Sequence, residues 1–151
     1  MTYWLRSYIF LIAALVFAAD RLTKYFIIKS LDLGQSIKVI PNIFHITLVS
    51  NYGAAFGLLQ DYAVFFIIFS FTAIALILLI ITKKPQLDMP LAVSLALILG
   101  GASGNIVDRI KFGHVIDFLD FRIWPVFNIA DSAISIGVAL LAFRFIFHRK
   151  A

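Results

Sequence analysis

Four long apolar segments, separated by stretches rich in polar residues, dominate the chain. They cover approximately residues 8–28, 62–82, 90–107 and 130–147. Each is near the ~20 residues that an α-helix needs to cross a hydrocarbon core about 30 Å thick. Because backbone groups in lipid must be hydrogen-bonded internally, this pattern predicts four transmembrane helices.

The first segment admits a second interpretation. Arg6, a short apolar run and the small residues before Asp20 resemble a secretory signal peptide that would be removed. The apolar pattern resumes after Lys24, however. Asp20 and Lys24 also have the i, i+4 spacing, acid first, that favours a pair on one helix face. We therefore expect a retained span in which this pair has a structural role.

The connection over residues 29–61 is too long for a simple hairpin. Its segment IFHITLV (43–49) is β-branched and aromatic, which predicts a strand, with 36–40 as its possible partner. The following NYGAAFGLL predicts a turn and a short amphipathic helix. The expected fold class is an all-α membrane protein with four transmembrane helices, a small extracytoplasmic β-sheet (approximately 36–50) and a short amphipathic helix between spans 1 and 2.

Composition supports a membrane protein. The chain is 62% apolar and 14% charged, against about 45–50% and about 25% in soluble domains. Its 151 residues allow a single domain, 1–151. The absence of cysteine excludes disulfides, thiol nucleophiles and thiolate metal sites. The net charge of +5 is scattered along the chain, so attraction to anionic lipid fits better than nucleic-acid binding.

The distribution of basic residues predicts the orientation. Four spans would place both termini on one side, with Arg6, the Lys83–Lys84 loop and the basic tail 148–150. The basic residues on the opposite side are balanced by Asp. The positive-inside rule therefore predicts cytoplasmic termini and an extracytoplasmic sheet.

The third apolar segment ends in GGASGNIVDR. Gly100 and Gly104 have the spacing of close helix–helix contacts. Asn105, Asp108 and Arg109 follow at i, i+3 and i+4, which places them on one helix face. This face is either a helix end with a snorkelling arginine or a polar binding site. The residues alone leave both interpretations open.

Three aspartates lie in the apolar stretch GHVIDFLDFRIWPVFNIADS. Asp131 falls in the first turn of the fourth span, with Asn128 as a plausible N-cap. Asp117 lies in a turn-rich stretch, and Asp120 is expected to face the interface. Taken singly, Asp131 is a favourable anion at a helix N-terminus and Asp117 a solvated loop acid.

A second interpretation brings Asp117 and Asp131 together. Two close carboxylates share a proton, because both cannot readily ionise. The charged member could then take a proton from water while the neutral member polarises an amide carbonyl, as in aspartic proteolysis. Spacing alone leaves open whether the two meet.

Other chemistries have less support. The histidines lack metal-like spacing, Ser103 and Ser132 lack an activating neighbour, and there is no phosphate-binding glycine loop. One alternative is a proton-coupled transporter or channel subunit with Asp108, Asp117 and Asp131 as a relay. Another is a non-catalytic membrane adaptor. The polar residues gather towards one interface rather than mid-membrane, which favours interfacial hydrolysis.

Five motifs occur in order along the chain: ADRLTK, NYGAAFG, GGASGNIVDR, HVIDF and FNIADS. On these motifs the chain resembles the bacterial lipoprotein signal peptidase family, signal peptidase II, over nearly its whole length. The resemblance implies that Asp117 and Asp131 form a catalytic dyad. It also implies residues that line the pocket, position the substrate backbone or support the dyad: Asn51, Asn105, Asp108, Arg109 and Asn128.

The resemblance further implies hydrolysis of the peptide bond just before the diacylglyceryl-modified cysteine of a prolipoprotein. The expected location is the bacterial inner membrane, with the active site near the extracytoplasmic interface. No metal, other cofactor or nucleic acid is expected, a monomer is expected, and cyclic peptides of the globomycin type would inhibit. Two departures stand out: Arg21 occupies a position where relatives often have Gln, and FLDFRIWPVF is shorter than in many members, which weakens any transfer of detail about the outer loops.

Overall fold

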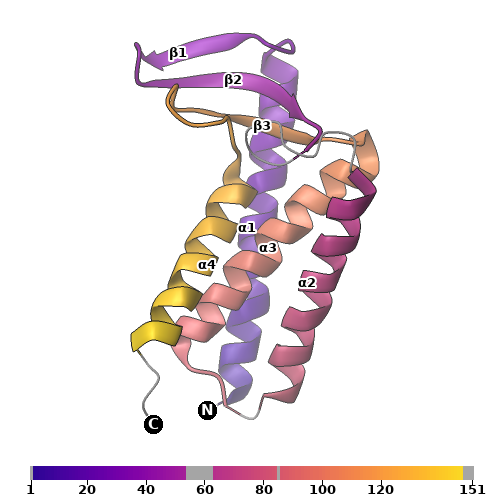
Figure 1. The fold of residues 1–151 in the computed structure, drawn as a ribbon, viewed down its shortest axis with the longest axis vertical. Helices are drawn as coiled ribbons and strands as arrows, with labels where there is room; N and C mark the ends of the chain where they lie inside the picture. Colours follow the sequence, from indigo (N-terminus) through magenta and orange to yellow (C-terminus); the bar gives the residue numbers. More distant parts are fainter. Residues whose placement is uncertain (1, 54–62, 85, 148–151) are drawn as a thin grey trace.

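The computed structural model describes residues 2–53, 63–84 and 86–147. The helices of this part lie side by side, and a small sheet crosses one end of them (Figure 1). The start of α1 and the end of α4 lie at the other end, away from the sheet (Figure 1). The elements in chain order are α1 (Thr2–Ser30), β1 (Ser36–Ile40), β2 (Phe44–Asn51), α2 (Ala63–Lys83), α3 (Met89–Phe112), β3 (Val115–Asp120) and α4 (Ile129–Phe147).

Helix α3 is the central element and packs against each of the other three helices. Its small residues make the close approach possible. A Cβ on Gly100 would lie 2.5 Å from the carbonyl oxygen of Ala13 in α1. At Gly104 the nearest atom would be a carboxylate oxygen of Asp20, also at 2.5 Å. The predicted close packing at these glycines is confirmed, and Gly104 in addition leaves room for a charged group.

Among the described residues, three helical stretches are long and apolar enough to cross a membrane: Val64–Lys83, Met89–Phe112 and Ile129–Phe147. Helix α1 is not one of them, and Asp20, Arg21 and Lys24 interrupt its apolar sequence. The structure therefore supports a mostly helical membrane protein.

Helix α3 extends beyond the predicted end of the third span. At its start Asp88 accepts a hydrogen bond from the backbone N–H of Leu91 (2.9 Å). It ends at Phe112 rather than near Val107, because Gly113 adopts a left-handed conformation (φ 77°) that terminates the helix. Residues 108 and 109 therefore project from a rigid helix.

The sheet is antiparallel, with strand order β1-β2-β3. The predicted strands over 36–40 and 43–49 are confirmed. The turn-rich assignment of Asp117 is wrong, because Asp117 lies on β3 opposite Val49 of β2. In Val115–Asp120 two apolar residues precede each aspartate, and β2 offers this segment a pairing edge. The predicted amphipathic helix falls mainly on 54–62, outside the described residues.

Candidate active site

Asp117 is held on β3 by two side-chain amides. Its carboxylate is buried, with 1% of the residue exposed. Asn51, at the end of β2, donates from Nδ2 to Asp117 Oδ2 (2.9 Å). Asn128, just before α4, donates from Nδ2 to Asp117 Oδ1 (2.6 Å). Both oxygens of this acid therefore accept a hydrogen bond from the protein.

Asp131 lies in the first turn of α4 and is held in a similar way. Asn105 of α3 donates from Nδ2 to Asp131 Oδ1 (2.7 Å). The backbone N–H of Asn128 donates to Asp131 Oδ2 (3.3 Å). In return Asn128 Oδ1 accepts from the N–H of Asp131 (2.8 Å), which confirms Asn128 as the N-cap. Asn128 thus contacts both Asp117 and Asp131.

The two acids also interact electrostatically. Burial, and next the Asp131 carboxylate, raise the pKa of Asp117 to about 7, although hydrogen bonds from Asn51 and Asn128 and the charge of Lys24 act in the opposite direction. A carboxyl group with this pKa exchanges its proton near neutral pH, which a general acid or base requires.

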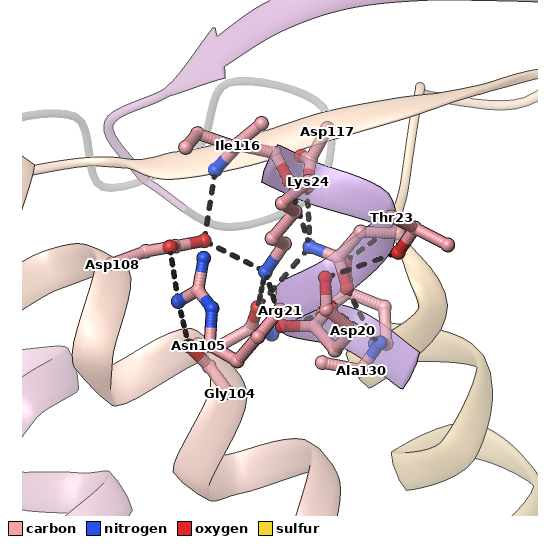
Figure 2. Close-up of polar contacts among 12 residues, drawn as sticks. Asp20, Arg21, Thr23, Lys24, Gly104, Asn105, Asp108, Ile116, Asp117 and Ala130 are labelled. Carbon is pink, nitrogen blue, oxygen red and sulfur yellow. Dashed lines mark hydrogen bonds and ion pairs between the residues drawn. The ribbon is translucent and has the colours of Figure 1, made fainter. Parts of the chain in front are cut away.

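An ionic cluster of Asp20, Arg21, Lys24 and Asp108 lies near Asp117 (Figure 2). Lys24 Nζ lies 2.9 Å from Asp20 Oδ2 and 2.7 Å from Asp108 Oδ2, and all three side chains are fully buried. Arg21 Nη1 pairs with Asp108 Oδ1 at 2.6 Å. Two cations therefore balance two anions, as a buried cluster requires. The predicted pairing of Asp20 with Lys24 is confirmed.

A cavity of about 760 Å³ opens beside Asp131. Three of the site residues expected from the family resemblance line this cavity: Asn51, Arg109 and Asp131. The guanidinium of Arg109 also lies over the Phe66 ring, 4.9 Å from its centre. Apolar side chains from Phe121–Phe127 and from α4 form the remaining wall.

The other implied residues lie behind this lining. Asn105 and Asp108 are buried and contact the ionic cluster, and Asp108 Oδ2 also accepts from the N–H of Ile116 (3.3 Å). Asn128 is fully buried between the two acids. Their contacts place these three residues where they can hold Asp117 and Asp131 in position, away from the cavity lining.

The expectation that Asp120 faces the interface is wrong. Asp120 is only 4% exposed, and it accepts hydrogen bonds from Thr47 Oγ1 (2.8 Å) and Arg122 Nη1 (3.0 Å). These donors lower the pKa of Asp120 against the opposing effect of burial. Asp120 therefore stabilises the turn after β3.

Sequence reasoning missed the contact between Lys24 and the site. Lys24 Nζ donates to Asn105 Oδ1 (3.0 Å), which links α1 to the amide beside Asp131. The two residues are 81 positions apart, and no local pattern reports such a contact. Within the described ranges, no group of three or more histidines and acids is placed to hold a metal ion.

Comparisons with known proteins identify the family of the chain. The sequence model of the family described as Signal peptidase (SPase) II matches residues 12–147. The chain is 42% identical to the lipoprotein signal peptidase of Halothermothrix orenii (strain H 168) over 88% of this chain and 91% of the relative. It is 48% identical to that of Moorella thermoacetica (strain ATCC 39073), over 89% of each chain.

A solved structure described as "Bacterial membrane enzyme structure by the in meso method at 2.3 A resolution" is similar in fold. It matches with a TM-score of 0.89 and 35% identity, over 95% of this chain and 92% of that one. Family match, sequence identity and fold agree over nearly the whole chain. The chain belongs to the signal peptidase II family of membrane peptidases.

Proposed function

We propose that this peptidase removes the signal peptide from diacylglyceryl-modified prolipoproteins, with Asp117 and Asp131 as its catalytic dyad. One observation carries the proposal: two buried or half-buried acids from separate elements are joined by Asn128 beside a cavity. The substrate class follows from the names of the relatives, which are lipoprotein signal peptidases.

In the proposed reaction the dyad holds one proton. The ionised carboxylate takes a proton from a water molecule as the water oxygen attacks the scissile carbonyl carbon. The protonated carboxyl donates to the carbonyl oxygen, giving a tetrahedral intermediate. As the intermediate collapses and the C–N bond breaks, the protonated carboxyl donates its proton to the amine nitrogen and the ionised carboxylate takes a proton back from a hydroxyl of the intermediate. The new carboxyl end and the amine are then released, and the dyad again holds one proton. Because the pair titrates as a unit, the proton belongs to both acids.

The cavity suits an amphiphilic substrate. Ile123 and Trp124 on the loop after β3 and Ile136 on α4 combine apolar lining with large exposed surfaces, 93%, 59% and 55% respectively. These surfaces can contact the diacylglyceryl group from the membrane side. Asn51 and Arg109, which also line the cavity, supply polar groups for the peptide backbone. Asn105, Asp108 and Asn128 keep the dyad in place.

We further propose that α1 is the fourth span and that residues 1–151 form one domain in the bacterial inner membrane. The charges of α1 form a neutral cluster with Asp108, which lowers the cost of placing them in a membrane. Both termini would be cytoplasmic and the sheet extracytoplasmic. The basic residues at the end away from the sheet support this orientation: Arg6, Lys83, Lys84 and Arg144.

The remaining partner assignments are also proposals. Cyclic peptides of the globomycin type would occupy the cavity beside Asp131 and compete with substrate. The enzyme would act as a monomer without a cofactor, since the residues proposed for the reaction all come from one chain.

The relay alternative has little in its favour. Asp108 is paired with Arg21 and Lys24 instead of lying open to water. A transporter would need it to exchange protons along a path. A non-catalytic adaptor would have no use for two acids held by the same amide.

Asparagine variants of the dyad test the proposal. Asp117→Asn and Asp131→Asn should each lower cleavage of a diacylglyceryl prolipoprotein in detergent by about 10²–10⁴-fold or more, because general acid–base catalysis is lost. Asp120→Asn, on the same strand as Asp117, is the matched control and should retain activity. Thermal unfolding verifies that each variant is folded.

Two results would contradict the proposal. Full activity of either dyad variant would exclude the dyad. Efficient cleavage of the same precursor without its lipid would exclude the proposed substrate class.

A further inference from the structure

Lys24, a fully buried cation, contacts the Asn105 amide in addition to its ion-pair partners. Lys24 is fully buried, and its ammonium has three oxygens within 3.0 Å: one each from Asp20, Asp108 and Asn105. An ammonium group carries three N–H donors and no acceptor. Each atom that faces it must therefore be an acceptor.

This requirement fixes the orientation of the Asn105 amide. Its oxygen must face Lys24, so its NH₂ group must face Asp131, to which it donates (2.7 Å). The same oxygen also accepts from Asn128 Nδ2 (3.1 Å), which in turn donates to Asp117 (2.6 Å). Lys24 therefore orients the Asn105 amide, while the N–H of Asp131 holds the oxygen of Asn128 (2.8 Å).

We propose that Lys24 is a positioning residue for the dyad and acts through the Asn105 amide. Its donor-only ammonium holds the oxygen of Asn105, so that this amide presents its N–H group to Asp131. The inference rests on the proposed function, because it assigns the cause of the geometry of that dyad.

Loss of the ammonium would have a defined consequence. The Asn105 oxygen would keep only the hydrogen bond from Asn128 Nδ2 (3.1 Å), and the amide could turn this oxygen towards Asp131 Oδ1, where two acceptors share a contact only around a proton. The proton needed for catalysis would be held between Asn105 and Asp131. The positive charge of Lys24 also lowers the pKa of Asp117, so its removal makes ionisation harder.

The sign of the effect on the pH profile follows. Activity needs one ionised acid, which sets the acid limb, and one protonated acid, which sets the alkaline limb. Removing a cation moves both limbs to higher pH, whereas partial unfolding lowers the amplitude and moves neither. The other charged groups around the dyad, unchanged in a Lys24 variant, are Asp20, Arg21, Asp108 and Arg109.

The test is the pH dependence of kcat and KM for a diacylglyceryl prolipoprotein in detergent. Lys24→Met keeps the apolar stem and removes the ammonium. We expect at least a tenfold fall in kcat at the wild-type optimum, a nearly unchanged KM and a shift of both limbs by about one pH unit upward. Lys24→Arg keeps a donor-only cation and should return the limbs towards their wild-type positions.

Two further variants separate positioning from charge balance. The double variant Asp20→Asn/Lys24→Met removes the cation together with one anion, and serves if Lys24→Met does not fold. Arg21→Gln is the matched control: Arg21 pairs with the other oxygen of Asp108 and with the Gly104 carbonyl (3.2 Å) instead of Asn105. Its limbs should move less than those of Lys24→Met, because Arg21 contacts neither Asn105 nor either acid of the dyad.

Unmoved limbs in Lys24→Met, or an undiminished kcat in the double variant, would overturn the inference. An equal shift in Arg21→Gln would do so too, because a general charge effect would then suffice. Asp117→Asn in the same assay separates the two levels of the argument. Its full activity would overturn the proposed dyad, whereas an inactive Asp117→Asn with unmoved Lys24 limbs would overturn only the positioning role.

Discussion

Asn128→Ala removes a side chain that contacts both proposed catalytic acids. In the native structure its Nδ2 donates to Asp117 Oδ1 (2.6 Å), Asn105 Oδ1 (3.1 Å) and the Ile116 carbonyl (3.3 Å). Its Oδ1 accepts from the N–H of Asp131 (2.8 Å). Alanine replaces none of these contacts, and the site is fully buried, so water has little access to repair them.

The expected loss of stability comes from two sources. Loss of the N-cap contact costs about 1 kcal/mol. Loss of a buried hydrogen bond to a carboxylate costs about 1.5–3 kcal/mol. The free energy of unfolding should therefore fall by about 2.5–4 kcal/mol. Because the two acids would no longer be held by one amide, kcat should fall by about 10²-fold or more even for the folded fraction.

The assay pairs thermal unfolding in detergent with cleavage of a diacylglyceryl prolipoprotein below the melting temperature. Ser103→Ala is the control: its hydroxyl donates only to the Leu99 carbonyl one turn earlier (2.8 Å), a bond that contributes little to helix stability. It should leave Tm and kcat nearly unchanged. An Asn128→Ala enzyme with wild-type kcat would refute the reasoning, because the shared amide would then be dispensable.

Two further predictions concern pH and helix packing. Burial and the Asp131 carboxylate raise the pKa of Asp117 to about 7, so the dyad loses its proton as the pH rises through this value. We therefore expect kcat to fall on the alkaline side. A kcat that does not change between pH 7 and pH 9 would contradict the assignment. Gly101→Ala would place a Cβ 2.5 Å from the Ala130 carbonyl oxygen, so α3 and α4 must separate and unfolding should become easier by about 1–3 kcal/mol. An unchanged Tm would show that the helix interface is loose.

The sequence predicted those elements whose cause is local. An apolar run of about 20 residues forms an α-helix in lipid, because its backbone groups must be hydrogen-bonded internally. The bounds expected for the last three spans therefore agree with α2, α3 and α4 to within a few residues, except at the end of α3. The strand over 43–49 was predictable because β-branched and aromatic residues are bounded there by turn residues. The four-residue spacing of Gly100 and Gly104 was enough to predict close packing of α3 against a neighbour.

The parts that the sequence did not predict depend on distant partners. Val115–Asp120 becomes a strand because β2 offers it an edge, and that edge comes from residues more than 60 positions earlier. Asp120 is buried because Thr47 and Arg122 supply donors. Its charge alone favoured an exposed position. The family motifs identified Asn105 and Asn128 as site residues, but the partners of their amide groups follow only from the three-dimensional structure.

At the sheet end of α3, the packing of α1 against α3 also determines the hydrogen bonds near the proposed dyad. Because Gly104 has no side chain, Asp20 can approach the helix, and its carboxylate holds the ammonium of Lys24. Lys24 then reaches Asn105, whose amide donates to Asp131. An alanine at position 104 would meet the Asp20 carboxylate directly and displace this chain of contacts. The missing Cβ of Gly104 thus connects the packing of α1 against α3 to the orientation of the proposed dyad. This connection explains why the charged residues of α1 lie next to the glycines of α3.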